Sequence, residues 1–243
     1  MENIINLNEL AEKIGNKPVK VLYHGEEKMA INWDASTAKD ALKEVYPYSQ
    51  HGDKVIFNGP APRWFASALA HTVHPCPVAL HDPKVGDIDI PHLPRGPENE
   101  AGHVHFNVEE GDKYVKLNWE IVSEQFPPVY NYEDLKNIVV PEIPEGKELC
   151  ISGRGPNYIT VALGEAYAHT NPDISYYQPQ TKGYTVGVSH NPMRSVGDLI
   201  PEQEVQKDLD VKKFEKEVLE KAGIELQENQ EELNRDSLTK DIR

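Results

Sequence analysis

Long apolar runs are missing from this chain of 243 residues. No stretch approaches the about 20 consecutive apolar residues that a membrane-spanning helix needs. Residues 1–15 are polar with a helical pattern, unlike a secretion signal. Cysteine is also scarce, because only Cys76 and Cys150 occur, in different halves and without metal-site spacing. We therefore expect free thiols in a reducing compartment, and a soluble cytoplasmic protein that does not enter a membrane.

Positive charge is in short supply as well. The chain has 25 Lys and Arg against 40 Asp and Glu, a formal net charge of -15. Binding to nucleic acid without regard to sequence depends on many Lys and Arg contacts to phosphates, so we expect no double-stranded DNA partner. A small anion in a shaped pocket remains compatible with this charge, since salt screens the distant acidic surface.

Residues 147–191 predict a strand, a glycine-rich turn, a helix, a histidine and two more strands. Leu149 and Ile151 alternate as in a half-buried strand, and a helix starting at Pro156 follows the Gly-Arg-Gly turn. The free N–H groups of that helix start, beside Arg154, would suit a phosphate. Alone, such a turn more often only connects strand and helix, and it matches neither the dinucleotide fingerprint nor a P-loop.

The same pattern occurs earlier in the chain, at residues 55–91, which favours two copies of one α/β unit. Upstream, Asn32-Trp33-Asp34 is paired with Asn118-Trp119-Glu120. The matched positions are Gly59 with Gly153, Pro62 with Pro156, His74 with His169, and Asp82-Pro83 with Gln178-Pro179.

Composition divides the chain into three parts: residues 1–95 and 103–200, each with a modest core, and residues 201–243. The last part predicts a helix with one apolar face that ends at Gly223, followed by a frayed tail. Elsewhere we expect helices at 7–14 and 38–45 and strands at 19–23, 28–33, 87–93, 103–108 and 114–119.

Histidines and an aspartate lie where the ends of strands and helices are predicted. A histidine exchanges a proton near neutral pH, and a His-Asp-His set can hold a divalent cation. His71, His81 and His103 have no match in the other copy, so we interpret them as ordinary surface or core residues. The candidate catalytic residues are His74, Asp82, His92, His169 and His190, with Asp82 and His74 as metal ligands.

The run from Ile151 to Pro172, followed by a residue-Pro pair and Val188-Ser189-His190, resembles the CRISPR-associated ring nuclease family three of type III systems. The resemblance implies a Rossmann-like unit, similar to nucleotide-sensing domains, present here as a diverged tandem duplication. It implies manganese-dependent cleavage of cyclic tetra-adenylate to linear oligoadenylates. It also implies an assembly in which pairs of protomers sandwich the ring, so we expect a homo-oligomer of a covalent pseudo-dimer.

Neither copy has the complete family pattern. The second copy has Gln178 where the family has aspartate, and the first has Lys84 where the family has arginine. This suggests that the second copy binds phosphate through Arg154 and the first supplies His74 and Asp82 for attack on phosphorus. The candidate substrate-binding residues are Asn58, Gly59, Arg63, Lys84, Ser152, Gly153, Arg154, Gly155 and Asn157.

Other functions fit the same residues. Two degraded copies could bind a cyclic oligonucleotide without cleaving it, as a sensor or sponge. A manganese-dependent exonuclease acting on RNA is a further alternative, although a basic groove with aromatic residues is not apparent in the sequence. Metal need not take part, because histidine-assisted attack by a 2′-hydroxyl requires none.

Overall fold

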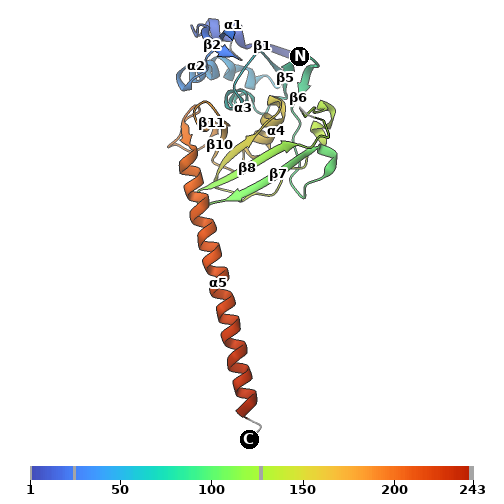
Figure 1. Ribbon diagram of the computed structural model, residues 1–243. Helices are drawn as coiled ribbons and strands as arrows, with labels where there is room; N and C mark the ends of the chain where they lie inside the picture. The colour runs from blue at the N-terminus through green and yellow to red at the C-terminus, as the bar shows by residue number, and fades with distance from the viewer. Residues whose placement is uncertain (1, 24–25, 126–127, 241–243) are drawn as a thin grey trace.

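A mixed α/β body and a long C-terminal helix make up the molecule (Figure 1). The computed structural model describes residues 2–23, 26–125 and 128–240. Within these ranges the strands form a sheet of four, a sheet of six and a two-stranded hairpin. This arrangement confirms the α/β class predicted from the sequence and is consistent with small Rossmann-like units.

The first half of the chain contains the four-stranded sheet, in the order β1-β4-β5-β6. Strands β1, β4 and β5 are parallel, β6 is antiparallel to β5, and α3 connects β4 to β5. The predicted strands at 19–23 and 28–33 pair only with each other, as β2 and β3. The elements are β1 (Glu2–Asn6), α1 (Leu7–Lys13), β2 (Val19–Tyr23), β3 (Glu26–Ala30), α2 (Ala35–Val45), η1 (Tyr46–Gln50), β4 (Lys54–Asn58), α3 (Arg63–Thr72), β5 (Val78–Asp82) and β6 (Gly86–Asp89).

Strand β1 corrects the prediction that the chain starts as a helix. Its five residues pair in parallel with β4, so that Asn6 lies opposite Asn58. Helix α1 begins at Leu7 because the Asn6 side chain accepts hydrogen bonds from the backbone N–H groups of Asn8 and Glu9. The strand covers one edge of β4, a pairing that local sequence does not encode.

The second half contains the six-stranded sheet, in the order β12-β11-β10-β9-β8-β7. Strands β8, β9 and β10 are parallel, β11 is antiparallel to β10, and α4 connects β9 to β10. The elements are η2 (Glu100–Gly102), β7 (Val104–Glu110), β8 (Tyr114–Ile121), η3 (Tyr132–Asn137), β9 (Glu148–Gly153), α4 (Asn157–Tyr167), β10 (Asp173–Gln178), β11 (Gly183–Ser189), β12 (Leu199–Pro201) and α5 (Glu202–Lys240).

The two sheets share one succession of elements: β1, β4, α3, β5 and β6 in the first correspond to β8, β9, α4, β10 and β11 in the second. Asn118 pairs with Ser152 in the second sheet, in the place that Asn6 and Asn58 occupy in the first. The predicted match of Asn118 with Asn32 is therefore wrong. Asn32 lies in the loop before α2, next to Asp34, which caps that helix.

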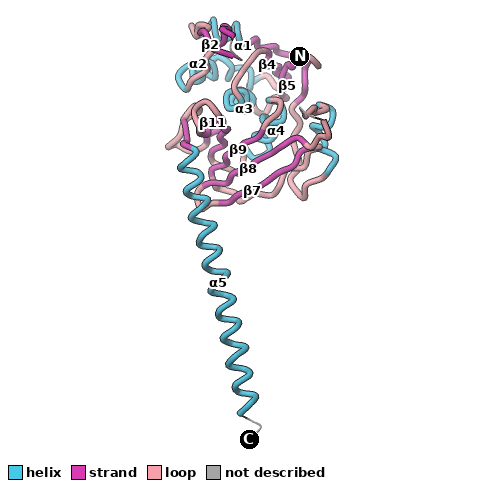
Figure 2. The backbone as a smooth tube through the Cα atoms, in the orientation of Figure 1, coloured by secondary structure: helices cyan, strands magenta, loops and turns pink. Residues whose placement is uncertain are grey.

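Helices α3 and α4 pack side by side between the two sheets, at the centre of the body (Figure 2). Their contact is made by small side chains, with Ala66 and Ala70 of α3 against Val161 of α4. Gly164 of α4 lies under the hydroxyl groups of Tyr176 and Ser67, where a Cβ atom would collide. The largest cluster of buried apolar residues draws on both halves, so the halves share a core instead of having the two separate cores that were expected.

Helix α5 leaves the body and extends to Lys240, well past the end predicted at Gly223 (Figure 1). A single glycine costs a helix only about 1 kcal/mol relative to alanine, and the Glu, Lys and Leu residues around it are good helix formers. Val205 and Leu209 at its base are buried in a second apolar cluster against the six-stranded sheet, whereas Val211 and Phe214 are exposed. None of the helices in the described ranges is both long and apolar enough to cross a membrane.

Candidate functional site

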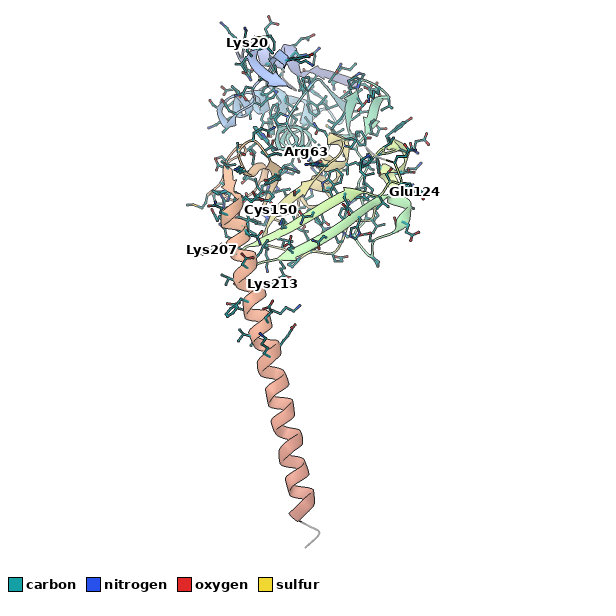
Figure 3. All side chains as sticks on the ribbon, in the orientation of Figure 1. Lys20, Arg63, Glu124, Cys150, Lys207 and Lys213 are labelled. Carbon is teal, nitrogen blue, oxygen red and sulfur yellow. The ribbon has the colours of Figure 1, made fainter. Side chains whose placement is uncertain are left out.

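The amino-terminal ends of α3 and α4 lie together and exchange hydrogen bonds. Asn157 Nδ2 donates to the carbonyl oxygen of Ala61 (2.9 Å), and the Arg63 guanidinium donates to the carbonyl oxygens of Gly153 and Gly155 (3.0 Å for the second). Arg63 is partly buried at the boundary between the halves, and burial lowers the pKa of its guanidinium (Figure 3). In the structure Arg63 joins the two halves, and its predicted role in substrate binding stays a prediction.

The glycine-rich turn of the second half packs tightly on Trp119. A Cβ atom on Gly153 would lie 2.5 Å from the indole ring, and one on Gly155 would lie 2.7 Å from it. These glycines therefore serve close packing, whether or not they also bind a ligand. Arg154 between them is exposed and has no hydrogen bond or ion pair with any described residue, which leaves it free for an anion. Ser152 is the next-to-last residue of β9, just before this turn.

A cavity of about 210 Å³ opens at this same end of the helix pair. It lies beside the carboxyl ends of strands β4 and β5, so we call it the carboxyl-end pocket. Gly59, Asp82, Asn157 and Tyr158 are among its lining residues, so both halves contribute. Burial, and then the negative charge of Asp82, raise the pKa of Tyr158 to about 12. One Asp82 oxygen accepts a hydrogen bond from the backbone N–H of Lys84 (2.8 Å), as in an ordinary turn.

Four histidines gather at the opposite end of the helix pair, and we call them the histidine cluster. His71 lies in the last turn of α3 and His74 follows that helix, His169 follows α4, and His190 follows β11. The ring centroids of His74 and His169 are 4.9 Å apart, and those of His71 and His190 are 5.0 Å apart. Because α3 and α4 run in the same direction, their carboxyl ends bring histidines of both halves to one surface.

A carboxylate lies beneath the histidine cluster. Glu165 Oε1 is 3.8 Å from His71 Nδ1, and each of these two buried atoms is without a hydrogen-bond partner among the described residues. Glu165, His74 and His92 also line a cavity of about 190 Å³. His71 was set aside on sequence grounds for want of a matching histidine. Yet it occupies the position of α3 that corresponds to Glu165 in α4, and that pairing was readable from the repeat.

His74 and Asp82 are not brought together. They lie at opposite ends of β5, whose five residues span about 13 Å between first and last Cα at about 3.3 Å per residue. The two side chains of one chain therefore do not fit a shared Mn²⁺. Within the described residues, no group of three or more His, Cys, Asp or Glu is arranged to hold a metal ion.

Comparison with protein families gives one finding for the second half. Residues 124–201 match the family described as CRISPR-associated protein (Cas_csx3). The matched segment contains the strand, glycine-rich turn and α4, together with His169 and His190. About a third of the chain, including half of the histidine cluster, is therefore similar to a CRISPR-associated protein family.

Proposed function

We propose that this protein is a ring nuclease that cleaves cyclic tetra-adenylate to linear oligoadenylates and so switches off type III CRISPR signalling. The similarity of residues 124–201 to a CRISPR-associated family supports a role in such a system. One observation carries the proposal of chemistry: His74 and His169, from different halves of the chain, lie with their ring centroids 4.9 Å apart at the surface.

The proposal includes a tandem duplication of one unit. Its support is the common order of strands, together with reciprocal contacts between corresponding positions. Arg63 and Asn157 are the first residues of α3 and α4, and each bonds to the turn that precedes the other helix. His71 and Glu165 face each other in the same way. Such reciprocity is what an approximate two-fold axis between the helices produces.

The chemistry assigned to the histidine cluster is attack by a ribose hydroxyl. A neutral histidine takes the proton of the 2′-hydroxyl, and O2′ forms a bond to phosphorus. The bond from phosphorus to O5′ breaks, and a protonated histidine of the other half donates its proton to O5′. The products have a 2′,3′-cyclic phosphate at one end and a 5′-hydroxyl at the other. His74 and His169 are assigned these two roles, and His190 is held by its contact with the Ala168 carbonyl oxygen (3.0 Å).

The carboxyl-end pocket and the histidine cluster are separated by the length of α4, 11 residues or about 16 Å at about 1.5 Å per residue. One ring cannot occupy both sites of a single molecule. In the homo-oligomer that we propose, two molecules stack end to end, so that Arg154 and Asp82 of one hold a ring against the histidine cluster of the other.

A direct test is to incubate the protein with cyclic tetra-adenylate, with and without Mn²⁺, and to separate the products by liquid chromatography. We expect linear products, and a fall in kcat of about 10²–10⁴-fold for His74→Gln and for His169→Gln, the usual contribution of general acid–base catalysis. His105→Gln is the matched control, because His105 is exposed on β7 of the six-stranded sheet. Normal kcat in both cluster variants would remove the assignment.

A binding protein without catalytic activity is the second candidate. It is favoured by the Asp82 carboxylate, which is engaged in its own turn, and by Gln178 in the corresponding place of the second half. Cyclic tetra-adenylate recovered intact but bound, with or without Mn²⁺, would establish this function. Degradation of linear RNA with the ring left intact would instead establish the exonuclease.

A further inference from the structure

A groove of about 770 Å³ lies between α2 of the first half and the segment after β11 of the second. Its volume is in the range of pockets that hold small ligands of nucleotide size. Thr72 and Ser189 form one part of its lining. They are the chain neighbours of His71 and His190, whose ring centroids are 5.0 Å apart, so the groove adjoins the histidine cluster.

The lining of this groove is basic, in a chain with a formal net charge of -15. It includes Lys39, Lys43 and Arg194, and no Asp or Glu is among its lining residues. Lys39 is exposed and forms no ion pair with a described residue. Lys43 is one helical turn further along α2 and contacts Asp40 (2.9 Å). Arg194 is held by Glu148 (3.0 Å) and is mostly buried, whereas both lysines are exposed to solvent, Lys43 beside its partner Asp40.

An aromatic ring completes the groove. Tyr46, directly after α2, lines it and is 59 % exposed, so its ring is accessible to a ligand. Stacking of a base on an exposed aromatic ring, beside cations that bind the backbone, is how proteins hold single-stranded nucleic acid. Hydroxyl groups of Ser36 and Ser195, also in the lining, can bond to ribose or phosphate oxygens.

We propose that this groove binds the nucleotide next to the scissile phosphodiester of a single-stranded oligoadenylate, with its phosphate at Lys39 and Lys43 and its base on Tyr46. A strand whose reacting phosphate lies at the histidine cluster continues past Thr72 and Ser189 into the groove. The identity of the strand rests on the proposed function; the basic, aromatic character of the groove does not.

The test is a titration of the full chain with fluorescein-labelled linear tetra-adenylate, followed by fluorescence anisotropy. For Lys39→Glu combined with Tyr46→Ala we expect Kd to rise at least about tenfold, since stacking alone contributes about 1–3 kcal/mol per base. Lys39→Ala should also flatten the dependence of log Kd on log salt by about 0.7, the value for one phosphate contact of a single strand. The control is Lys213→Glu, because Lys213 is an exposed lysine on α5, away from this groove (Figure 3).

Assays on the cyclic ring separate this proposal from the proposed function. Weaker binding of the linear strand by the groove variants supports the groove even if wild-type protein leaves the ring intact. Cleavage of the ring with KM and Kd unchanged in Lys39→Glu/Tyr46→Ala would overturn the groove and leave the ring nuclease standing. Equal loss of binding in Lys213→Glu would also overturn the groove proposal, because binding would then depend on net charge alone. Both groove side chains are exposed, so the melting temperature should not change.

Discussion

Single side chains at the amino-terminal ends of α3 and α4 hold the two halves together. Arg63 reaches the carbonyl oxygens of Gly153 and Gly155, and Asn157 reaches that of Ala61. The turns that suggest a phosphate site in the sequence are thus also the points of contact between the halves. Arg154 is exposed, and a ligand-binding role for it stays a prediction.

Replacement of Arg63 by alanine should lower stability. The change leaves two turn carbonyls without their donor, and hydrogen bonds to a charged group contribute about 1.5–3 kcal/mol each. Since Arg63 is only partly buried, we expect a loss of about 2–4 kcal/mol in the free energy of unfolding, measured by denaturant titration.

Arg154→Ala is the control for this prediction. Its exposed side chain has no hydrogen bond or ion pair with a described residue, so stability should stay the same while affinity for the cyclic ring falls. If Arg154→Ala destabilised the protein as much as Arg63→Ala, the distinction between a structural and a ligand-binding arginine would be wrong.

At the scale of elements, the contact between α3 and α4 depends on small residues that let two helices and a strand approach closely. Gly164 is the tightest point, because the hydroxyl groups of Tyr176 and Ser67 share a hydrogen bond directly above it. Gly187 of β11 plays a similar part, since a Cβ atom there would lie 2.6 Å from the carbonyl oxygen of Trp64.

Gly164→Ala tests this close packing. In an exposed helix the change would stabilise by about 1 kcal/mol. Here the new methyl group would collide with the Tyr176 hydroxyl, and overpacking of a core costs about 1–3 kcal/mol, so we expect net destabilisation.

A double-mutant cycle with Tyr176→Phe identifies the cause. Phenylalanine removes the hydroxyl, so Gly164→Ala should cost less in the Tyr176→Phe background than in the wild-type protein. Equal costs in the two backgrounds would show that the hydroxyl is not what limits residue 164.

At the scale of the whole molecule, α5 has two parts with different surroundings. Its base covers the six-stranded sheet, where Asp208 accepts hydrogen bonds from the backbone N–H groups of Lys113 and Tyr114. Burial in the same region raises the pKa of the Cys150 thiol to about 12, which keeps it protonated and unreactive at neutral pH. Beyond the base the helix projects away from the body (Figure 1).

Two leucines of α5 provide a matched comparison. Leu209 is 5 % exposed and packs in the apolar cluster at the base, whereas Leu219 is 72 % exposed. Leu209→Ala should therefore lower the free energy of unfolding by about 2–4 kcal/mol, and Leu219→Ala should change it by less than about 0.5 kcal/mol. Similar losses at both positions, measured by thermal unfolding, would mean that the projecting part is also packed.

Local sequence predicted the strand-turn-helix segments around Gly59 and Gly153. Helical spacing of apolar residues and proline at the helix start are short-range signals, and they correctly indicated α3 and α4. Strand β1 was missed because its five residues have little strand character of their own and depend on pairing with β4.

The prediction of a catalytic pair from His74 and Asp82 overlooked the topology of a βαβ unit. The helix of such a unit runs antiparallel to its strands. His74, which follows the helix, therefore lies toward the amino ends of the strands, whereas Asp82, the last residue of the next strand, lies at their carboxyl ends.

Residue type and spacing were enough to indicate the α/β class, the recurrence of one pattern in both halves, and His74, His169 and His190 as candidate residues. Which of these residues meet depends on the packing of the two halves. The parallel packing of α3 on α4 assembles the histidines at one end and leaves Asp82 and Arg154 at the other. It also joins α2 to the segment after β11 in a basic groove that neither half forms alone. Contacts between distant segments depend on how helices and sheets pack, and local spacing does not specify that packing.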